Sequence, residues 1–287
     1  MENITFTYNT SPFSVKFKKL TRDPLPFAQE LIETAKYINT LTTKPIMLVL
    51  SGGIDGETTA LSFLTAGIPF EVLTCNYKSR ANYLDTKYAK EFCERHDIKQ
   101  HFIELDDENF YFNKGYEKYI EQGYISNNLY NYLQLYLLEI VESMGCTAVC
   151  GGGDQTYKIE NNTLCFKTDT PVINTLEWCK NNKTLHFPYF FITTPELTVS
   201  YMEDTLIKFF INNYDYYAGI QDFDYNMEKT ILFHSIYPSM PKRRKYTGFE
   251  AIIDKRLREE AELKARFPEV KKVFIPLSTV REELGIK

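Results

Sequence analysis

Residues 48–61 read LVLSGGIDGETTAL, and this stretch decides the fold. The apolar run Ile46–Leu50 is typical of a parallel strand that is covered on both faces. Residues 51–53 predict a tight turn, and residues 57–66 predict a helix that stops at Gly67. Glycines let backbone N–H groups approach an anion, and a helix N-terminus adds positive partial charge. The stretch therefore predicts a phosphate-binding turn.

Strands and helices continue to alternate outward from this stretch. Strands are predicted at 70–75, 101–105 and 147–150, and helices at 83–96 and 129–144. This alternation predicts an α/β fold with a doubly wound parallel sheet, whose ligands lie beyond the carboxyl ends of the strands. A second glycine-rich stretch, residues 151–154, follows the last strand and is expected at the same edge.

The flanking regions follow other patterns. The N-terminus predicts a β-hairpin from residues 4–8 and 13–18 and a helix at 27–41. The C-terminal region predicts a mixed, largely helical structure: a hairpin-like stretch at 157–166, helices at 195–212 and 249–267, and a final strand and helix within 273–284. We therefore expect three parts, residues 1–43, 44–156 and 157–287, the last carrying substrate specificity.

Composition limits the function classes. The chain has 287 residues with 44% hydrophobic and 25% charged content, which is ordinary for a globular protein. A net charge of −5 argues against a protein whose main task is holding nucleic acid. The six cysteines form no CxxC pair, the N-terminus lacks a signal-peptide pattern, and no apolar run approaches a membrane span. We expect a reduced, cytoplasmic protein with no membrane association.

The glycine turn does not fit two common phosphate loops. A Walker loop needs Gly-Lys-Ser/Thr where this chain has Gly56-Glu57-Thr58, and GxGxxG is absent. The Ser-Gly-Gly-x-Asp pattern at 51–55 instead resembles the PP-loop superfamily of ATP pyrophosphatases over residues 44–155. This superfamily has the adenine nucleotide alpha hydrolase-like fold and includes NAD and GMP synthetases, preQ0 synthases and tRNA thiolases. The motif is nearest to asparagine and β-lactam synthetases.

The resemblance implies ATP and Mg²⁺ as cofactors and assigns residues to them. Asp55 and Asp154 would hold the metal, and the end of the second strand at Cys75 and Asn76 would seat the adenine. Lys78 and Arg80 are expected to reach phosphate or substrate, or else to be solvated. The phosphate cradle would consist of Ser51, Gly52, Gly53, Ile54, Asp55, Gly56 and Glu57, with Gly151 and Gly152 from the second loop.

The basic segment 241–248 is the only dense basic cluster. In related synthetases such a segment closes on the phosphates, so Arg243, Arg244 and Lys245 are expected to join Asp55 as catalytic groups. A nucleic-acid patch and a solvated loop are the alternatives. For Asp154 the alternative to metal binding is a turn cap.

One position departs from the family pattern. Most members have Ser or Thr directly after the aspartate, whereas this chain has Gly56. Thr58 or Thr59 would then supply the hydroxyl, or the Gly56 N–H would act alone. A degenerate, weakly catalytic site is the remaining alternative.

The function expected from the resemblance is an AMP-forming ligase. A carboxylate or carbonyl oxygen of a small-molecule substrate would attack the α-phosphorus of ATP, pyrophosphate would leave, and ammonia or an amine would form an amide. Because no cysteine follows Met1, nitrogen would come from free ammonia, an amine or an ammonia-supplying partner. The alternatives are a sulfur-inserting or base-modifying enzyme acting on tRNA or a nucleotide, and a non-catalytic adenine-nucleotide-binding module.

Overall fold

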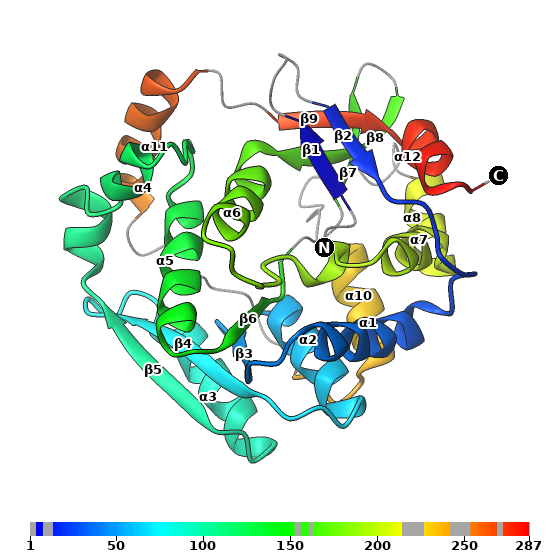
Figure 1. Ribbon diagram of the computed structural model, residues 1–287, viewed down its shortest axis with the longest axis horizontal. Coiled ribbons are helices and arrows are strands. Elements are labelled where there is room, and N and C mark those ends of the chain that lie inside the picture. Colours follow the sequence, from blue (N-terminus) through cyan, green and yellow to red (C-terminus); the bar gives the residue numbers. More distant parts are fainter. Residues whose placement is uncertain are drawn as a thin grey trace.

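The computed structural model describes residues 4–7, 14–152, 156–160, 163–213, 227–241, 253–268 and 272–286 (Figure 1). A four-stranded sheet flanked by helices forms one side of the molecule, and two smaller sheets lie on the other side. Within the described part of the chain, no helix combines the length and the apolar character needed to cross a lipid bilayer.

The central sheet is parallel throughout and has the strand order β5-β4-β3-β6. Its register aligns Val49 with Leu73 of one neighbour and with Cys150 of the other. This topology confirms the α/β fold with a doubly wound parallel sheet that the alternating pattern predicted. The strands are β3 (Ile46–Val49), β4 (Glu71–Tyr77), β5 (Gln100–Leu105) and β6 (Thr147–Cys150).

Two hydrophobic cores cover the two faces of this sheet. Ile46 and Leu48 pack into the first core, whereas Met47 between them packs into the second. Alternate residues of a strand point to opposite faces, so a continuous apolar run supplies both cores. Helices α1 (Phe27–Leu41), α2 (Ile54–Thr65) and α3 (Tyr83–Arg95) line the first core, and α5 (Leu129–Ser143) lines the second.

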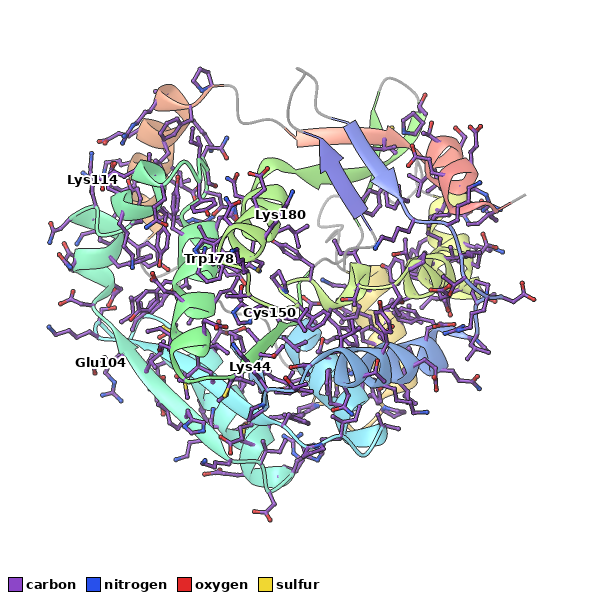
Figure 2. All side chains as sticks on the ribbon, viewed as in Figure 1. Lys44, Glu104, Lys114, Cys150, Trp178 and Lys180 are labelled. Atoms are coloured by element: carbon purple, nitrogen blue, oxygen red, sulfur yellow. The ribbon has the colours of Figure 1, made fainter. Side chains whose placement is uncertain are left out.

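The second core is rich in aromatic side chains. Tyr111, Tyr119 and Tyr132 are fully buried in it, and Trp178 and Cys150 belong to the same core (Figure 2). Three elements not predicted from the sequence contribute to this layer. They are a π-helical turn η1 (Glu108–Phe112) and helices α4 (Glu117–Glu121) and α6 (Thr170–Asn181).

Helix α2 begins at Ile54, three residues earlier than predicted. Gly53 takes the N-cap position with an extended backbone (φ −77°, ψ 156°), so the helix starts directly after the glycine turn. Asp55 and Glu57 then both lie in the first turn, where the positive end of the helix dipole favours carboxylates. The turn and the helix N-terminus therefore form one continuous unit.

The smaller sheets join the two ends of the chain. Strands β1 and β2 form an antiparallel hairpin, and β7, β8 and β9 form an antiparallel sheet. The backbone N–H of Phe17 donates to Glu283 at 2.8 Å, and that of Leu20 donates to the Leu284 carbonyl. These strands and the final helix are β1 (Ile4–Thr7), β2 (Ser14–Phe17), β7 (Thr156–Glu160), β8 (Thr163–Asp169), β9 (Lys272–Pro276) and α12 (Leu277–Leu284).

The C-terminal region differs from the prediction in one helix. The helix predicted at 195–212 is broken at Asp204, whose backbone is extended and whose side chain accepts from the Leu206 N–H at 2.9 Å. Asp204 therefore caps a new helix instead of continuing the old one. The remaining elements are η2 (Phe190–Ile192), α7 (Pro195–Glu203), α8 (Thr205–Asn212), α10 (Met227–Ile236) and α11 (Ile253–Arg266).

Candidate functional site

The order of the central strands places the switch point of the sheet, where open α/β folds form their binding crevice, between β3 and β6. From β3 the chain moves outward to β4 and β5, and then returns to place β6 on the other side of β3. Connections therefore leave the carboxyl ends of β3 and β6 in opposite directions, which is where open α/β sheets bind their ligands. Both glycine-rich stretches begin at this point, residues 51–53 after β3 and residues 151–152 after β6.

The turn after β3 packs tightly against the start of α3. Gly52 has a positive φ of 85°, and a Cβ atom added there would meet the Asp85 carbonyl and lie 2.9 Å from the Ala89 nitrogen. Only glycine satisfies both the backbone conformation and this close approach. The contact fixes the turn between α2 and α3.

The turn after β6 packs directly on the first one. A Cβ atom on Gly151 would lie 2.6 Å from the Asp55 carbonyl carbon and 2.6 Å from the Gly56 nitrogen. A Cβ atom on Gly152 would lie 3.1 Å from the Tyr189 ring. The structure thus brings together the two glycine-rich stretches that the sequence placed at one sheet edge.

A buried polar network supports the second glycine turn, residues 151–152. The Tyr189 hydroxyl lies 3.0 Å from both Gln134 Oε1 and Thr175 Oγ1, and Gln134 Nε2 donates to the Pro188 carbonyl at 3.2 Å. Tyr189 also pairs with Gly151 through the backbone. The network connects α5 and α6 to the second glycine turn.

Lys229 is a site residue that sequence reasoning missed. Its side-chain nitrogen lies 2.9 Å and 3.1 Å from the two carboxylate oxygens of Asp55, and only 4% of the residue is exposed. An ammonium group that is buried to this extent depends on a paired anion. Lys229 lies in no recognisable sequence motif, and 174 residues separate it from Asp55. The sequence therefore does not indicate that the two side chains meet.

The C-terminal segment around Lys229 packs along α2. Thr58 contacts Met240 Sδ at 3.8 Å, and the Ser62 hydroxyl lies 3.3 Å from the Tyr237 hydroxyl. The Thr59 hydroxyl donates to the Asp55 carbonyl at 2.9 Å. Because Thr58 and Thr59 are buried and engaged in these contacts, the structure gives no support to either as a replacement for the hydroxyl that Gly56 lacks.

The other predicted cradle residues differ in exposure. Ser51 is exposed at the turn, Gly53 and Ile54 are half-buried, and Glu57 is buried within α2. Gly56 has ordinary backbone geometry, and a Cβ atom there would meet only the movable end of Leu50, at 2.7 Å. Glu57 is therefore buried in the first turn of α2, whereas Ser51 is exposed to solvent.

The end of β4 contains the residues predicted for adenine and phosphate. Cys75 and Asn76 are half-buried. Lys78 is exposed and pairs with Asp106 at 3.1 Å, on the side of β5 and away from β3. Arg80 has a positive φ of 62° and lies 5.4 Å from the centre of the Tyr83 ring. Roles for Lys78 and Arg80 at the phosphates remain predictions.

The thiols near the site are not poised as nucleophiles. Burial raises the pKa of Cys75 to about 12, with the Asp107 carboxylate adding to the effect, and burial also raises the pKa of Cys150 to about 12. Thiolate is the reactive form of cysteine. Both thiols are therefore protonated near neutral pH and act as small apolar residues.

The predicted metal site is only partly described. Asp154 lies outside the described residues, as do Arg243, Arg244 and Lys245, so their roles remain predictions. Among the residues that the structure describes, no three side chains of His, Cys, Asp or Glu come together as a metal site. Mg²⁺ is commonly held by one or two carboxylates plus substrate phosphates. Asp55 at the N-terminus of α2 fits that arrangement.

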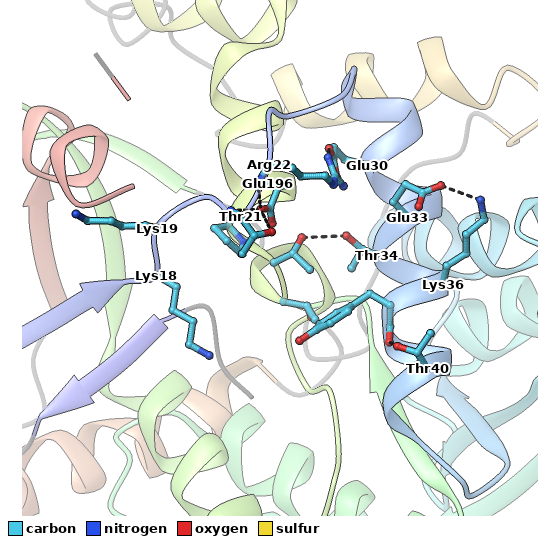
Figure 3. Close-up of a pocket in the computed structure, with 14 residues that line it drawn as sticks. Lys18, Lys19, Thr21, Arg22, Glu30, Glu33, Thr34, Lys36, Thr40 and Glu196 are labelled. Atoms are coloured by element: carbon cyan, nitrogen blue, oxygen red, sulfur yellow. Dashed lines mark hydrogen bonds and ion pairs between the residues drawn. The ribbon is translucent and has the colours of Figure 1, made fainter. Parts of the chain in front are cut away.

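A separate cavity of about 510 Å³ lies between the 18–22 segment, α1 and the start of α7 (Figure 3). Its two buried carboxylates are already engaged. Glu30 pairs with Arg22, and Glu196 accepts from the backbone and hydroxyl of Thr21 at 2.6 and 2.7 Å. These contacts fasten the 18–22 segment to the core, which accounts for the polar lining of the cavity.

Comparison with known proteins finds a family match over part of the central sheet and its helices. Residues 45–114 match the model of the queuosine biosynthesis protein QueC. No curated protein matches the chain. Solved structures with similarity are NMN synthetase from Francisella tularensis (14% identity, 84% of this chain and 92% of that chain, TM-score 0.37) and NH3-dependent NAD synthetase from Campylobacter jejuni (14%, 76% and 99%, 0.35).

A third solved structure is the U34-tRNA thiolase NcsA from Methanococcus maripaludis, with 10% identity, coverage of 85% of this chain and 81% of that chain, and a TM-score of 0.32. The QueC match spans β3, the first glycine turn, α2, β4, α3 and β5, whereas β6 and the second glycine turn lie outside it. The motif at 51–55, the parallel sheet around it and this match over residues 45–114 all agree with the resemblance to the PP-loop superfamily of ATP pyrophosphatases.

Proposed function

We propose that this protein is an AMP-forming enzyme that uses ATP to activate a carboxylate or carbonyl oxygen. The single observation that carries the proposal is the contact between the two glycine turns at the β3/β6 crevice, with Gly151 against the Asp55 backbone. Through this contact, the turns that follow β3 and β6 form a single phosphate cradle. The N-terminus of α2 lies in this cradle, and its backbone N–H groups favour a phosphate.

The proposed reaction has two steps. The substrate oxygen attacks the α-phosphorus of ATP, the bond to the β-phosphate oxygen breaks, and pyrophosphate leaves with that electron pair. Ammonia or an amine then attacks the activated carbon, AMP leaves, and the nitrogen loses a proton to give an amide. The protein contributes positioning and electrostatic stabilisation of the departing pyrophosphate.

Three groups of this chain serve that purpose. The N-terminus of α2 orients the phosphates, Lys229 places a positive charge beside them, and Asp55 would hold Mg²⁺, which supplies charge neutralisation when bound. Gly52 and Gly151 keep the backbone close enough for the phosphates to reach it. A clamp formed by Arg243, Arg244 and Lys245 is proposed in addition.

A second candidate function is favoured by the match to a queuosine biosynthesis protein over 45–114. In this reading the activated oxygen belongs to a nucleobase or modified-base precursor, and the chain is a base-modifying enzyme. A sulfur-inserting reaction would need a reactive thiol, and the raised pKa of Cys75 and of Cys150 opposes that role for these two residues. The nitrogen version of the reaction is therefore preferred.

Product analysis tests the proposal. The protein is incubated with Mg²⁺, ATP, ammonium and pooled carboxylates or nucleobase carboxylates that carry ¹⁸O. We expect AMP and pyrophosphate in equal amounts and transfer of one ¹⁸O atom into AMP. Formation of ADP and phosphate would reject the proposed chemistry. Intact ATP that remains bound with every substrate would instead indicate a non-catalytic nucleotide-binding module.

A further inference from the structure

Strand β5 forms an outer edge of the central sheet, and Figure 1 shows it along the margin of the molecule. Its register with β4 is continuous from Gln100 to Leu105. The Val72 N–H donates to the Lys99 carbonyl, and the Lys78 N–H donates to the Leu105 carbonyl. Main-chain groups of odd-numbered β5 residues therefore point toward β4, and those of even-numbered residues point outward.

The outward edge of β5 is open. The outward main-chain groups of Gln100, Phe102 and Glu104 have no backbone partner among the described residues. Exposed strand edges pair readily with further strands, and proteins usually blunt them with proline, lysine or a bulge. The six residues of β5 read QHFIEL, and the strand contains none of these features. It can therefore accept one more strand.

The opposite edge of the sheet, at β6, is covered by the chain itself. The Phe187 N–H donates to the Ala148 carbonyl at 2.8 Å, and the Phe187 carbonyl accepts from the Cys150 N–H at 2.9 Å. Phe187 and Tyr189 also form bridges to Val149 and to the residue after β6. The two edges of the sheet thus differ, and β5 is the one that leaves its main chain available.

The side chains of β5 suit a second copy of the same strand. Phe102 lies near the middle of β5 and is 49% exposed. It shares a face of the sheet with Gln100 and Glu104, because alternate residues of a strand point the same way. Glu104 is exposed at the margin of the molecule (Figure 2). Gln100 Nε2 donates to Thr74 Oγ1 at 2.8 Å, and the amide nitrogen carries a second N–H for another acceptor.

Antiparallel pairing about a twofold axis at Phe102 matches each of these side chains. Phe102 then lies opposite the partner's Phe102, and aromatic pairs in this position stabilise antiparallel strands. Gln100 lies opposite the partner's Glu104, which places an amide donor beside a carboxylate acceptor. A shift of two residues in either direction would place Phe102 opposite a glutamine or a glutamate and separate the two rings. The strand is therefore complementary to its own twofold image.

We propose that the protein forms a twofold dimer in which β5 pairs antiparallel with β5 of a second copy, centred on Phe102. The two central sheets then become one continuous sheet, and the self-complementary contact closes after two copies. The phosphate cradle follows β3 and β6, and β4 separates β3 from β5. The dimer therefore leaves both cradles accessible, and the inference is independent of the proposed use of ATP.

Sedimentation equilibrium over a concentration series tests the dimer. We expect the wild type to have twice the monomer mass. Phe102→Lys places like charges directly opposite each other, and Phe102→Pro removes an outward N–H without removing a bond to β4. Both variants should be monomers with the circular dichroism spectrum of the wild type. Phe209→Lys is the matched control, because Phe209 is 50% exposed but lies on α8, and it should remain a dimer.

Disulfide cross-linking tests the register of the pairing. Cα atoms in a hydrogen-bonded antiparallel pair lie about 5.5 Å apart, which is within the range that a disulfide spans. Phe102→Cys should therefore give a covalent dimer with oxidised glutathione, seen on denaturing gels without reductant. Glu104→Cys should not, because its counterpart lies four residues along the partner strand. The wild type, whose own cysteines are free, shows the background.

Three results would overturn the inference. They are a wild type that stays monomeric across the concentration series, a dimer that both Phe102→Lys and Phe102→Pro leave intact, and cross-linking that is no greater for Phe102→Cys than for Glu104→Cys. ATP binding by the monomeric variants should match that of the wild type. Failure of the dimer and failure of the proposed function are therefore observed in separate measurements.

Discussion

At the scale of single residues, the site depends on glycines whose neighbours are backbone atoms. The Gly151 position is bounded by the main chain of Asp55 and Gly56, which cannot move aside without shifting α2. Gly56 itself is bounded by the flexible end of Leu50. We therefore expect an added side chain to be disruptive at Gly151 and to be tolerated at Gly56.

Gly151→Ala should reduce pyrophosphate formation by at least tenfold, because its methyl group would separate the two turns that cradle the phosphates. Product assays and chemical denaturation measure activity and stability on the same preparation. Gly67→Ala is the control: its positive φ of 68° costs about 1 kcal/mol, but its surroundings are open. Loss of activity in both variants in equal measure would show that stability alone is responsible.

Gly56→Ser should fold and retain turnover. Leu50 can change rotamer to admit the new Cβ atom, at an expected loss of about 1–3 kcal/mol of stability. The variant restores the hydroxyl common in the superfamily at this position. An unfolded or inactive product would show that the space beside Leu50 is not adjustable.

Because Lys229 and Asp55 form an ion pair, substitution of one and substitution of the other should have opposite effects on ATP binding in the absence of metal. Without Mg²⁺, the Asp55 carboxylate repels the triphosphate and Lys229 attracts it. Lys229→Met should therefore weaken ATP binding in EDTA by about tenfold, which is about 1.4 kcal/mol, and Asp55→Asn should strengthen it. With Mg²⁺ present, Asp55→Asn should lose most of its turnover.

Lys44→Met is the matched control for Lys229→Met. Lys44 is exposed, pairs with Glu142 at 2.6 Å and precedes β3 at the opposite edge of the sheet (Figure 2). Its loss should leave ATP binding unchanged. If Lys229→Met and Asp55→Asn both weaken metal-free binding, the pair has a structural role only.

At the scale of elements, the parallel sheet and its helices were predicted well from the sequence. In this region each hydrophobic pattern that indicates a strand or a helix is bounded by turn-forming residues. The run at 46–50, the glycine turn and the helices at 27–41 and 83–96 all recur within a few residues of their predicted bounds. Helix α10 was not predicted, since its apolar residues do not fall on one face: Leu232 and Phe233 are buried while Ile231 is exposed.

The site was predictable only where it is local in sequence. Residues 51–57 and 151–152 could be found because glycine clusters follow strands. Lys229 could not, because no pattern distinguishes it from a solvated lysine until α10 packs along α2.

His186 makes the segment beside β6 sensitive to pH. Its Nδ1 accepts from the Ala148 N–H at 3.0 Å, Nε2 lies 3.3 Å from Glu142, and burial lowers its pKa to about 4. The folded protein therefore takes up the proton less readily than the unfolded chain. Stability from this residue is complete above pH 6.5 and is lost as the pH falls toward 4.

The expected loss is roughly 3 kcal/mol between pH 6.5 and 4, since each pKa unit corresponds to about 1.4 kcal/mol. Urea denaturation at several pH values measures it. His186→Gln, which can still accept from Ala148, should show a shallower dependence over this range. An identical slope in wild type and variant would exclude His186 as the source.

At the scale of the whole molecule, the two chain ends stabilise each other. Helix α12 buries Val280 and Leu284 completely. Its Glu283 side chain accepts from the Phe17 N–H at the end of β2, and its Leu284 carbonyl accepts from the Leu20 N–H. The last helix therefore secures the hairpin and the 18–22 segment that leads into α1. The C-terminus is part of the first hydrophobic core.

Leu284→Ala should lower the free energy of unfolding by about 2–5 kcal/mol, because it leaves a cavity in a fully buried position. Denaturant titration measures the loss. Leu257→Ala, at a leucine that is 53% exposed, should change stability by about 0.5 kcal/mol or less. A small effect at Leu284 would mean that α12 contributes little to the core.

The 174-residue separation of Asp55 and Lys229 also has a consequence during protein synthesis. The ribosome adds about 5–20 residues per second, so the glycine turn is made roughly 9–35 seconds before its lysine. Throughout that interval the nascent chain carries the aspartate without the cation that neutralises it. A product that is truncated or stalled before Lys229 therefore lacks the cation that pairs with Asp55.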